Sequence, residues 1–221
     1  MGKFMIFSLL WWITGNPLLA LLVLLIIVYV LDRRFVGVFP DISRPFKLNR
    51  RLAKLLQELR VHSHNTSGKL EAARILIEKK RFGEAKAYLE QIVPVMEDSA
   101  EVLYELGLCH LKLGELEVGE KLMQKALSIN PRVKYGEPYL RLGEAFLKAD
   151  PGKALHYLEN FRKEQSSSCQ AYYLLGKLYN ELGRKEDANR AFREISEIYR
   201  VLPKYKRKQE RRWVLLSRFR F

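Results

Sequence analysis

The sequence predicts an all-α protein: an apolar N-terminal helix, then a stack of about four helix pairs, then a basic C-terminal helix. Three observations lead to this prediction. The stretch from Phe4 to Leu31 contains no charged residue, residues 66–200 repeat at a spacing near 34 residues, and the net charge of +14 resides in the flanks. The 221 residues suffice for one sizeable domain plus an appendage, and 48% apolar residues are too many for a disordered chain.

The charge distribution separates a neutral middle from two basic flanks. Val61 to Tyr199 hold 21 basic and 21 acidic residues, whereas residues 32–60 hold eight basic and three acidic ones, and residues 200–221 nine basic ones and one Glu. Attraction to anionic partners is therefore expected from the flanks. Cys109 and Cys169 lie 60 residues apart, which fits neither a disulfide framework nor a zinc motif and favours a reducing compartment.

Residues 1–31 are predicted to form a membrane anchor. Trp11 to Leu31 is 21 residues long, about 31 Å as a helix and close to the thickness of a bilayer core. The Gly15-Asn16-Pro17 sequence indicates a kink or a short interfacial helix before the span, because Asn can cap a helix and Pro suits its first position. A signal peptide is disfavoured, since the apolar stretch is too long and lacks a small-x-small cleavage site. A buried apolar helix is the remaining alternative.

Residues 32–64 are interpreted as a basic juxtamembrane linker followed by a helix from Lys47 to Arg60. Because far more Arg and Lys residues follow the apolar stretch than precede it, the positive-inside rule predicts a single-pass protein. In this topology the N-terminus is outside and the repeats are cytoplasmic.

Residues 66–200 carry the internal repeat. One small residue recurs at intervals of 34, 36 and 33 residues on the first helix of each pair, and another recurs on the second helix. Small residues at these points let two helices approach closely, so Gly107 and Gly119 are expected to face each other. A period near 34 built from two amphipathic helices predicts an α-solenoid. The small residues are Ala73, Gly107, Gly143 and Gly176 on first helices, and Ala85, Gly119, Ala154 and Ala188 on second helices.

This pattern resembles the tetratricopeptide repeat (TPR), and the resemblance covers about 135 residues. Residues 169–200 match well, whereas the third unit has a shortened turn and the first lacks a closing Pro. The best match is residues 100–133, with Leu106, Gly107, His110, Gly119, Met123, Ala126 and Pro131 at the pattern positions.

The resemblance implies a concave groove that is lined by the first helices and binds a protein or peptide. Chaperone-binding TPR domains hold a C-terminal carboxylate with Lys and Asn, but Tyr104 and Leu108 occupy two such positions here, so that activity is not supported. The expected groove is mostly apolar and suits an amphipathic or extended apolar ligand, unless flanking helices of the chain cover it. Its residues are Leu70, Arg74, Ile77, Tyr104, Leu108, Leu111, Leu140, Glu144, Leu147, Tyr173, Lys177 and Asn180.

The C-terminal flank, residues 201–221, is predicted to form a basic and aromatic helix. It could cap the last repeat or lie on an anionic membrane, and the membrane is slightly favoured. Nucleic-acid binding ranks third. The predicted membrane-surface residues of both flanks are Arg33, Arg34, Lys204, Lys206, Arg207, Lys208, Arg211, Arg212, Trp213 and Phe219.

Reactive chemistry is not predicted. His62 and His64 lack the neighbouring ligands of a metal site and are expected in an exposed turn. No phosphate-binding loop, nucleophile elbow or paired acid motif is present in the sequence, so we predict no enzyme activity, no metal and no cofactor. The sequence favours a membrane-tethered TPR scaffold that binds a protein or peptide. The alternative is a peripheral binder of anionic lipid or nucleic acid that acts through the basic flanks.

Overall fold

A computed structural model describes residues 10–31 and 43–218 of the chain. The chain divides into two compact units, with the boundary between Lys47 and Leu48. The first unit contains α2 (Pro17–Leu31) and the start of α3 (Ser43–Val61), and the second contains the remainder of α3 and every later helix.

The helix break at Gly15 divides the apolar N-terminal stretch. Gly15 has a φ of +62°, and the Leu18 N–H donates to Asn16 Oδ1 at 2.9 Å, so Asn16 caps a new helix whose first residue is Pro17. Residues 10–14 are helical but end before this turn. The 21-residue run is therefore not one continuous helix.

This break overturns the predicted membrane anchor. With 15 residues, α2 is about 22 Å long, well short of the roughly 30 Å of a bilayer core. Across the described residues, none of the helices combines the length and the apolar character that a membrane crossing requires. The predicted transmembrane helix is wrong, and so is the single-pass topology with the N-terminus outside and the repeats in the cytoplasm.

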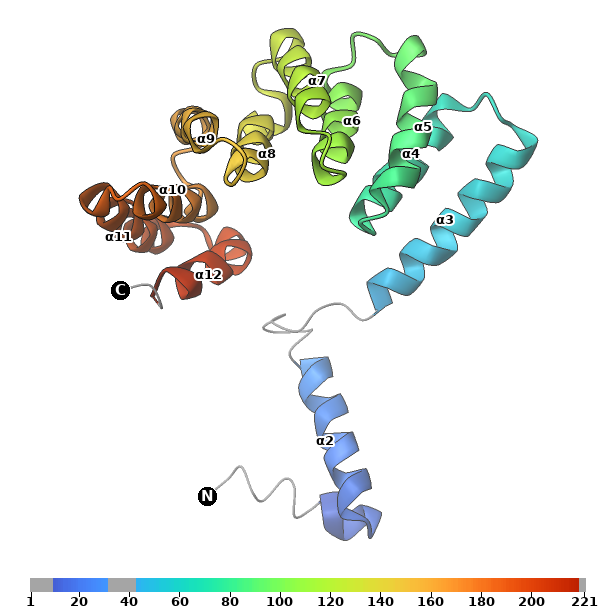
Figure 1. Cartoon of the computed structure of the whole chain (residues 1–221). Coiled ribbons are helices and arrows are strands. Elements are labelled where there is room, and N and C mark those ends of the chain that lie inside the picture. Colours follow the sequence, from blue (N-terminus) through green and yellow to red (C-terminus); the bar gives the residue numbers. More distant parts are fainter. Residues whose placement is uncertain (1–9, 32–42, 219–221) are drawn as a thin grey trace. The chain divides into compact units, whose positions relative to one another are not determined.

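The second unit is a succession of antiparallel helix pairs, which confirms the predicted all-α stack of pairs (Figure 1). The helices of each pair contact one another, and each pair contacts the next. Two short 3₁₀ helices, η2 (Val93–Val95) and η3 (Val133–Gly136), lie between pairs, and α12 (Lys204–Arg218) follows the last pair. The pairs are α4 (Thr66–Glu78) with α5 (Phe82–Ile92), α6 (Ala100–Lys112) with α7 (Leu116–Ile129), α8 (Glu137–Phe146) with α9 (Pro151–Glu164), and α10 (Cys169–Glu181) with α11 (Lys185–Val201).

The helices of the α6–α7 pair are tightly packed where the sequence repeats its small residues. A Cβ added to Gly107 would lie 3.2 Å from the carbonyl oxygen of Gly119 and 3.1 Å from Met123 Cγ. A Cβ added to Gly119 would lie 2.6 Å from Leu111 Cδ2 and 3.1 Å from the Gly107 carbonyl oxygen. The two glycines therefore face each other as predicted, and a larger residue at either position would overpack the seam at a cost of about 1–3 kcal/mol.

The core is continuous because α6 contributes to both of its clusters. Val102 and Leu106 pack with α3, α4 and α5, whereas Leu103 packs with the later helices. Cys109 and Cys169 are fully buried, and burial raises the pKa of each thiol to about 12. Both cysteines therefore remain neutral and fill the core.

Candidate functional site

The predicted groove residues divide into a buried apolar set and a more accessible polar set. Tyr104, Leu111, Leu140 and Tyr173 are each no more than 8% exposed. Tyr104, Leu140 and Tyr173 occupy equivalent positions in three units, and their side chains form a buried apolar stripe instead of the predicted groove surface. The accessible groove residues are the exposed Arg74 and Asn180 and the half-buried Leu70, Ile77, Leu108, Glu144, Leu147 and Lys177.

Neighbouring units cover the two tyrosines. Burial raises the pKa of Tyr104, which lies close to Glu137 and Arg141 of the next pair. The Tyr173 ring lies 5.4 Å from the ring of Trp213 in α12 and 6.2 Å from that of Phe192 in α11. At this end of the stack, a flanking helix of the chain covers a predicted groove residue, as the sequence alternative allowed.

A polar strip connects the first helices, and it begins between α4 and α6. The Arg74 guanidinium donates from Nη2 to Glu101 Oε2 at 2.8 Å and from Nε to Glu105 Oε1 at 2.7 Å. Lys134 in η3 approaches the same Glu101 oxygen at 3.4 Å. Burial raises the pKa of Glu105 despite the opposing effect of Arg74. One guanidinium therefore ties two turns of α6 to α4.

Glu144 continues the strip from α6 to α10. Its carboxylate accepts from Arg141 Nη1 at 3.0 Å and from Gln170 Nε2 at 2.5 Å, and it lies 3.9 Å from Lys112 Nζ. The Gln170 backbone N–H donates to Glu210 Oε2 of α12 at 3.2 Å. Partly exposed ion pairs contribute only about 0–1 kcal/mol each, so the strip provides charge pattern and polar contact points more than stability.

Sequence reasoning missed most of this strip, although a signal was present. Glu101, Glu137 and Gln170 precede the predicted groove residues Tyr104, Leu140 and Tyr173 by three residues each. Three residues is nearly one helical turn, so these side chains lie on the same helix face one turn earlier. Their repetition in three units was the available indication.

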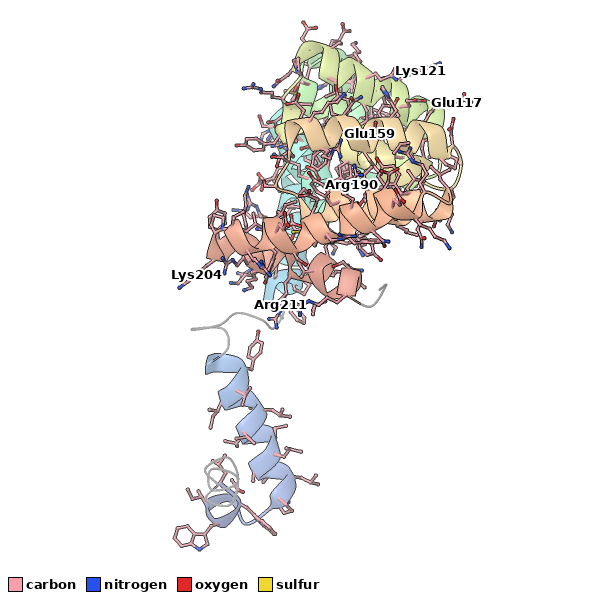
Figure 2. The ribbon with its side chains drawn as sticks, turned by 90° about the vertical axis from the view of Figure 1, so that its left-hand side faces the viewer. Glu117, Lys121, Glu159, Arg190, Lys204 and Arg211 are labelled. Carbon is pink, nitrogen blue, oxygen red and sulfur yellow. The ribbon has the colours of Figure 1, made fainter. Side chains whose placement is uncertain are left out.

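The basic residues of α12 have different roles in the structure. Arg207 donates from Nε to the Leu202 carbonyl at 2.7 Å and from Nη2 to the Arg200 carbonyl at 2.5 Å, which caps the end of α11. Trp213 and Lys206 are half-buried. Lys204, Lys208, Arg211 and Arg212 are exposed, and Figure 2 shows Lys204 and Arg211 at the surface. Arg33, Arg34 and Phe219 lie outside the described residues.

His62 and His64 lie in the turn between α3 and α4, where both side chains are exposed. The His62 carbonyl accepts from the Asn65 N–H, and Asn65 caps α4 through the Gly68 N–H. Within residues 10–31 and 43–218, no three His, Cys, Asp or Glu side chains gather where a metal ion could bind.

Comparison with known families identifies two tetratricopeptide repeats. The tetratricopeptide repeat profiles match residues 100–133 and residues 170–200, which correspond to the α6–α7 and α10–α11 pairs. These are the two units with the most complete sequence pattern, so the predicted resemblance is confirmed for them. No curated protein matches the chain.

Solved structures share the fold of the chain at low sequence identity. The crystal structure of MamA has a TM-score of 0.62 and 21% identity, covering 72% of this chain and 95% of MamA. MamA from Desulfovibrio magneticus RS-1 has a TM-score of 0.63 and 14% identity, covering 71% and 88%. YrrB, a TPR protein with an unusual peptide-binding site, has a TM-score of 0.56 and 19% identity, covering 77% and 86%. At such low identities these structural matches show a TPR-like α-solenoid fold and do not show a shared function.

Proposed function

We propose that the chain is a TPR scaffold, not an enzyme, and that it binds a protein or peptide partner along the first-helix face. The observation that carries the proposal is the polar strip, which consists of two groups of contacts that share α6. Arg74 joins α4 to α6, and Glu144 on α8 contacts Lys112 on α6 and Gln170 on α10. Half-buried Ile77 lies on α4, Leu108 lies on α6, and Leu147 directly follows α8. The peptide-binding site of YrrB supports this use of the fold.

The chemistry of this face refines the expected partner. Because the apolar stripe of tyrosines and leucines is buried, an extended apolar ligand would find little surface to bury. Alternating charges and amides offer hydrogen bonds to a peptide main chain and to polar side chains of both signs. The proposed partner is therefore a polar, extended segment with a few small apolar residues.

The test uses the purified full chain and an array of short peptides of mixed sequence. Replacing Lys177→Ala together with Asn180→Ala removes two accessible groove side chains without opening the core. Peptides that bind the unmodified chain should bind this variant at least about tenfold more weakly. The matched control replaces Lys121→Ala and Arg190→Ala on the second helices α7 and α11, both labelled in Figure 2. Equal binding by both double variants would refute the groove.

A second candidate function is binding of an anionic lipid surface by α12. It is favoured by the exposure of Lys204, Lys208, Arg211 and Arg212 on a helix whose apolar residues Trp213 and Val214 pack inward. The attraction would then be electrostatic, without insertion of Trp213. Vesicles with anionic headgroups should bind the chain at low salt and release it as salt rises. Binding that persists at high salt would contradict this mode.

A further inference from the structure

A polar cavity of about 250 Å³ lies where η3, α8, α10 and α12 meet the end of α9 and the turn that follows it. Its apolar contacts are Leu140 and Phe161, and Tyr135, which is 79% exposed, lines it as well. At about 30 Å³ for each water, the cavity holds the volume of roughly eight waters, enough for one side chain. Its lining residues Glu137 and Gln170 belong to the row that precedes the predicted groove residues by one turn, so a partner along that face would reach the cavity.

The two carboxylates in the lining are already engaged. Glu137 pairs with Arg141, and Glu210 accepts from the Gln170 backbone N–H at 3.2 Å. The lining also contains three cations, Arg141, Lys134 and Lys206. Of these, Lys134 lies 3.4 Å from Glu101. Both carboxylates of the cavity therefore already accept hydrogen bonds from the protein, and the cavity does not favour a cationic ligand.

The unengaged groups of the cavity are mostly donors. Among the described residues, the Lys206 ammonium makes no ion pair within 4 Å, although it is close enough to Glu210 to lower the pKa of that carboxyl. The side chains of Gln165, Ser167 and Gln209 make no hydrogen bond to other described residues. An ammonium supplies three donors and no acceptor, while each amide and hydroxyl can also donate. A cationic ligand would meet Lys134 and Lys206, whereas an anionic one would meet donors on several sides.

We infer that this cavity binds an anionic group of the partner, a carboxylate or a phosphate carried on one side chain. The inference rests on the proposed function, because it identifies the anchor that positions the peptide on the first-helix face. Lys206 is the residue that would bind the anion most strongly, since charge-assisted hydrogen bonds are about twice as strong as neutral ones.

The direct test titrates the ¹⁵N-labelled full chain with sodium acetate, inorganic phosphate or methylammonium chloride at constant ionic strength. Acetate or phosphate should produce a saturable shift of the side-chain amide signals of Gln165 and Gln209. Acetate acting alone would indicate an acidic partner side chain, and phosphate acting alone a phosphorylated one. A comparable shift with methylammonium, or no saturable shift with either anion, would overturn the inference.

Matched lysine variants distinguish specific anion binding in the cavity from general attraction of anions to a basic helix. Lys206→Ala should weaken anion binding about fivefold to tenfold, while Lys204→Ala, on the same helix but outside the cavity lining, should leave it unchanged. Lys206→Gln keeps most of the side chain and controls for lost packing, so it should weaken binding as well. An equal loss for Lys204→Ala and Lys206→Ala would overturn the site.

The peptide array distinguishes this inference from the proposed function. If Lys177→Ala with Asn180→Ala abolishes peptide binding while Lys206→Ala preserves the affinity for acidic peptides, the groove stands and the anion site fails. If acetate or phosphate binds at Lys206 while the groove variant retains every peptide, the anion site stands and the proposed groove fails.

Discussion

The two basic helices that flank the repeats, α3 and α12, look alike in sequence but differ in how they join the stack. Residues 48–61 of α3 bury Leu52 and Leu59, at 4% and 8% exposure, and reach α4 and its C-terminal cap through Arg51–Glu71 and Lys79–Asn49 contacts. These contacts involve side chains on both sides, so α3 covers the first pair without capping a helix end.

By contrast, α12 engages the backbone ends of two repeat helices. Arg207 satisfies carbonyls at the end of α11, and Glu210 accepts from the first turn of α10. Val214 and Ser217 are 5% and 2% exposed, and Trp213 packs on Tyr173. A net positive charge therefore does not indicate whether a flanking helix packs on the repeats or stays at the surface. That depends on the spacing of its apolar residues and on whether its side chains can bond to the backbone ends of neighbouring helices.

The largest expected effect comes from ending the chain after Leu202. Loss of α12 uncovers Tyr173 and removes Trp213, and deletion of a packed aromatic alone costs about 3–5 kcal/mol of unfolding free energy. The melting temperature should fall strongly. Removal of residues 1–42, which precede α3, is the control and should change it little. A C-terminal cut without thermal effect would make α12 a surface helix like the one the sequence suggested.

The repeats were predictable from sequence because their signals are local and recur. Gly107 and Gly119 indicate close packing of the two helices of one pair without reference to the rest of the chain. Four units in the same register strengthen the prediction of a repeat. The groove was not predictable to the same degree. Whether Tyr104 faces solvent depends on Arg141 and Glu137, which belong to the next repeat. The membrane span failed for another reason: the kink that was expected at Gly15-Asn16-Pro17 is a complete break, and the helix after it has only 15 residues.

The second prediction tests the packing of α3. Leu52→Ala should lower the unfolding free energy by about 2–4 kcal/mol, since Leu52 is 4% exposed and the truncation leaves a cavity. Phe46→Ala, at a position that is 70% exposed on the same helix, should have almost no effect. Chemical denaturation monitored by circular dichroism gives both values. If the two variants behave alike, α3 does not dock on the first pair.

A smaller effect separates structural from surface charge on α12. Arg207→Ala removes two hydrogen bonds to the terminal carbonyls of α11 and should cost about 1–2 kcal/mol. Arg211→Ala removes an exposed cation, labelled in Figure 2, and should change stability by less than about 0.5 kcal/mol. Thermal melts of both variants provide the measurement. The opposite ranking would mean that Arg207 does not cap α11.

The smallest effect concerns pH and distinguishes the contact of Glu210 with α10 from a simple surface charge. Burial raises the pKa of Glu210, although the hydrogen bond from the Gln170 backbone N–H opposes this shift. The folded state therefore holds this proton to a higher pH than the unfolded state, whose Glu pKa is about 4.3. The resulting stabilisation is complete below that value and is lost as pH rises through the folded pKa.

The Glu210→Gln variant carries no such titration, so the melting temperature of the unmodified chain should fall relative to that of the variant as pH rises from 4 towards neutral. Glu58→Gln on α3, which makes the same change in net charge, is the control. If both variants give the same pH profile relative to the unmodified chain, Glu210 is not buried against α10.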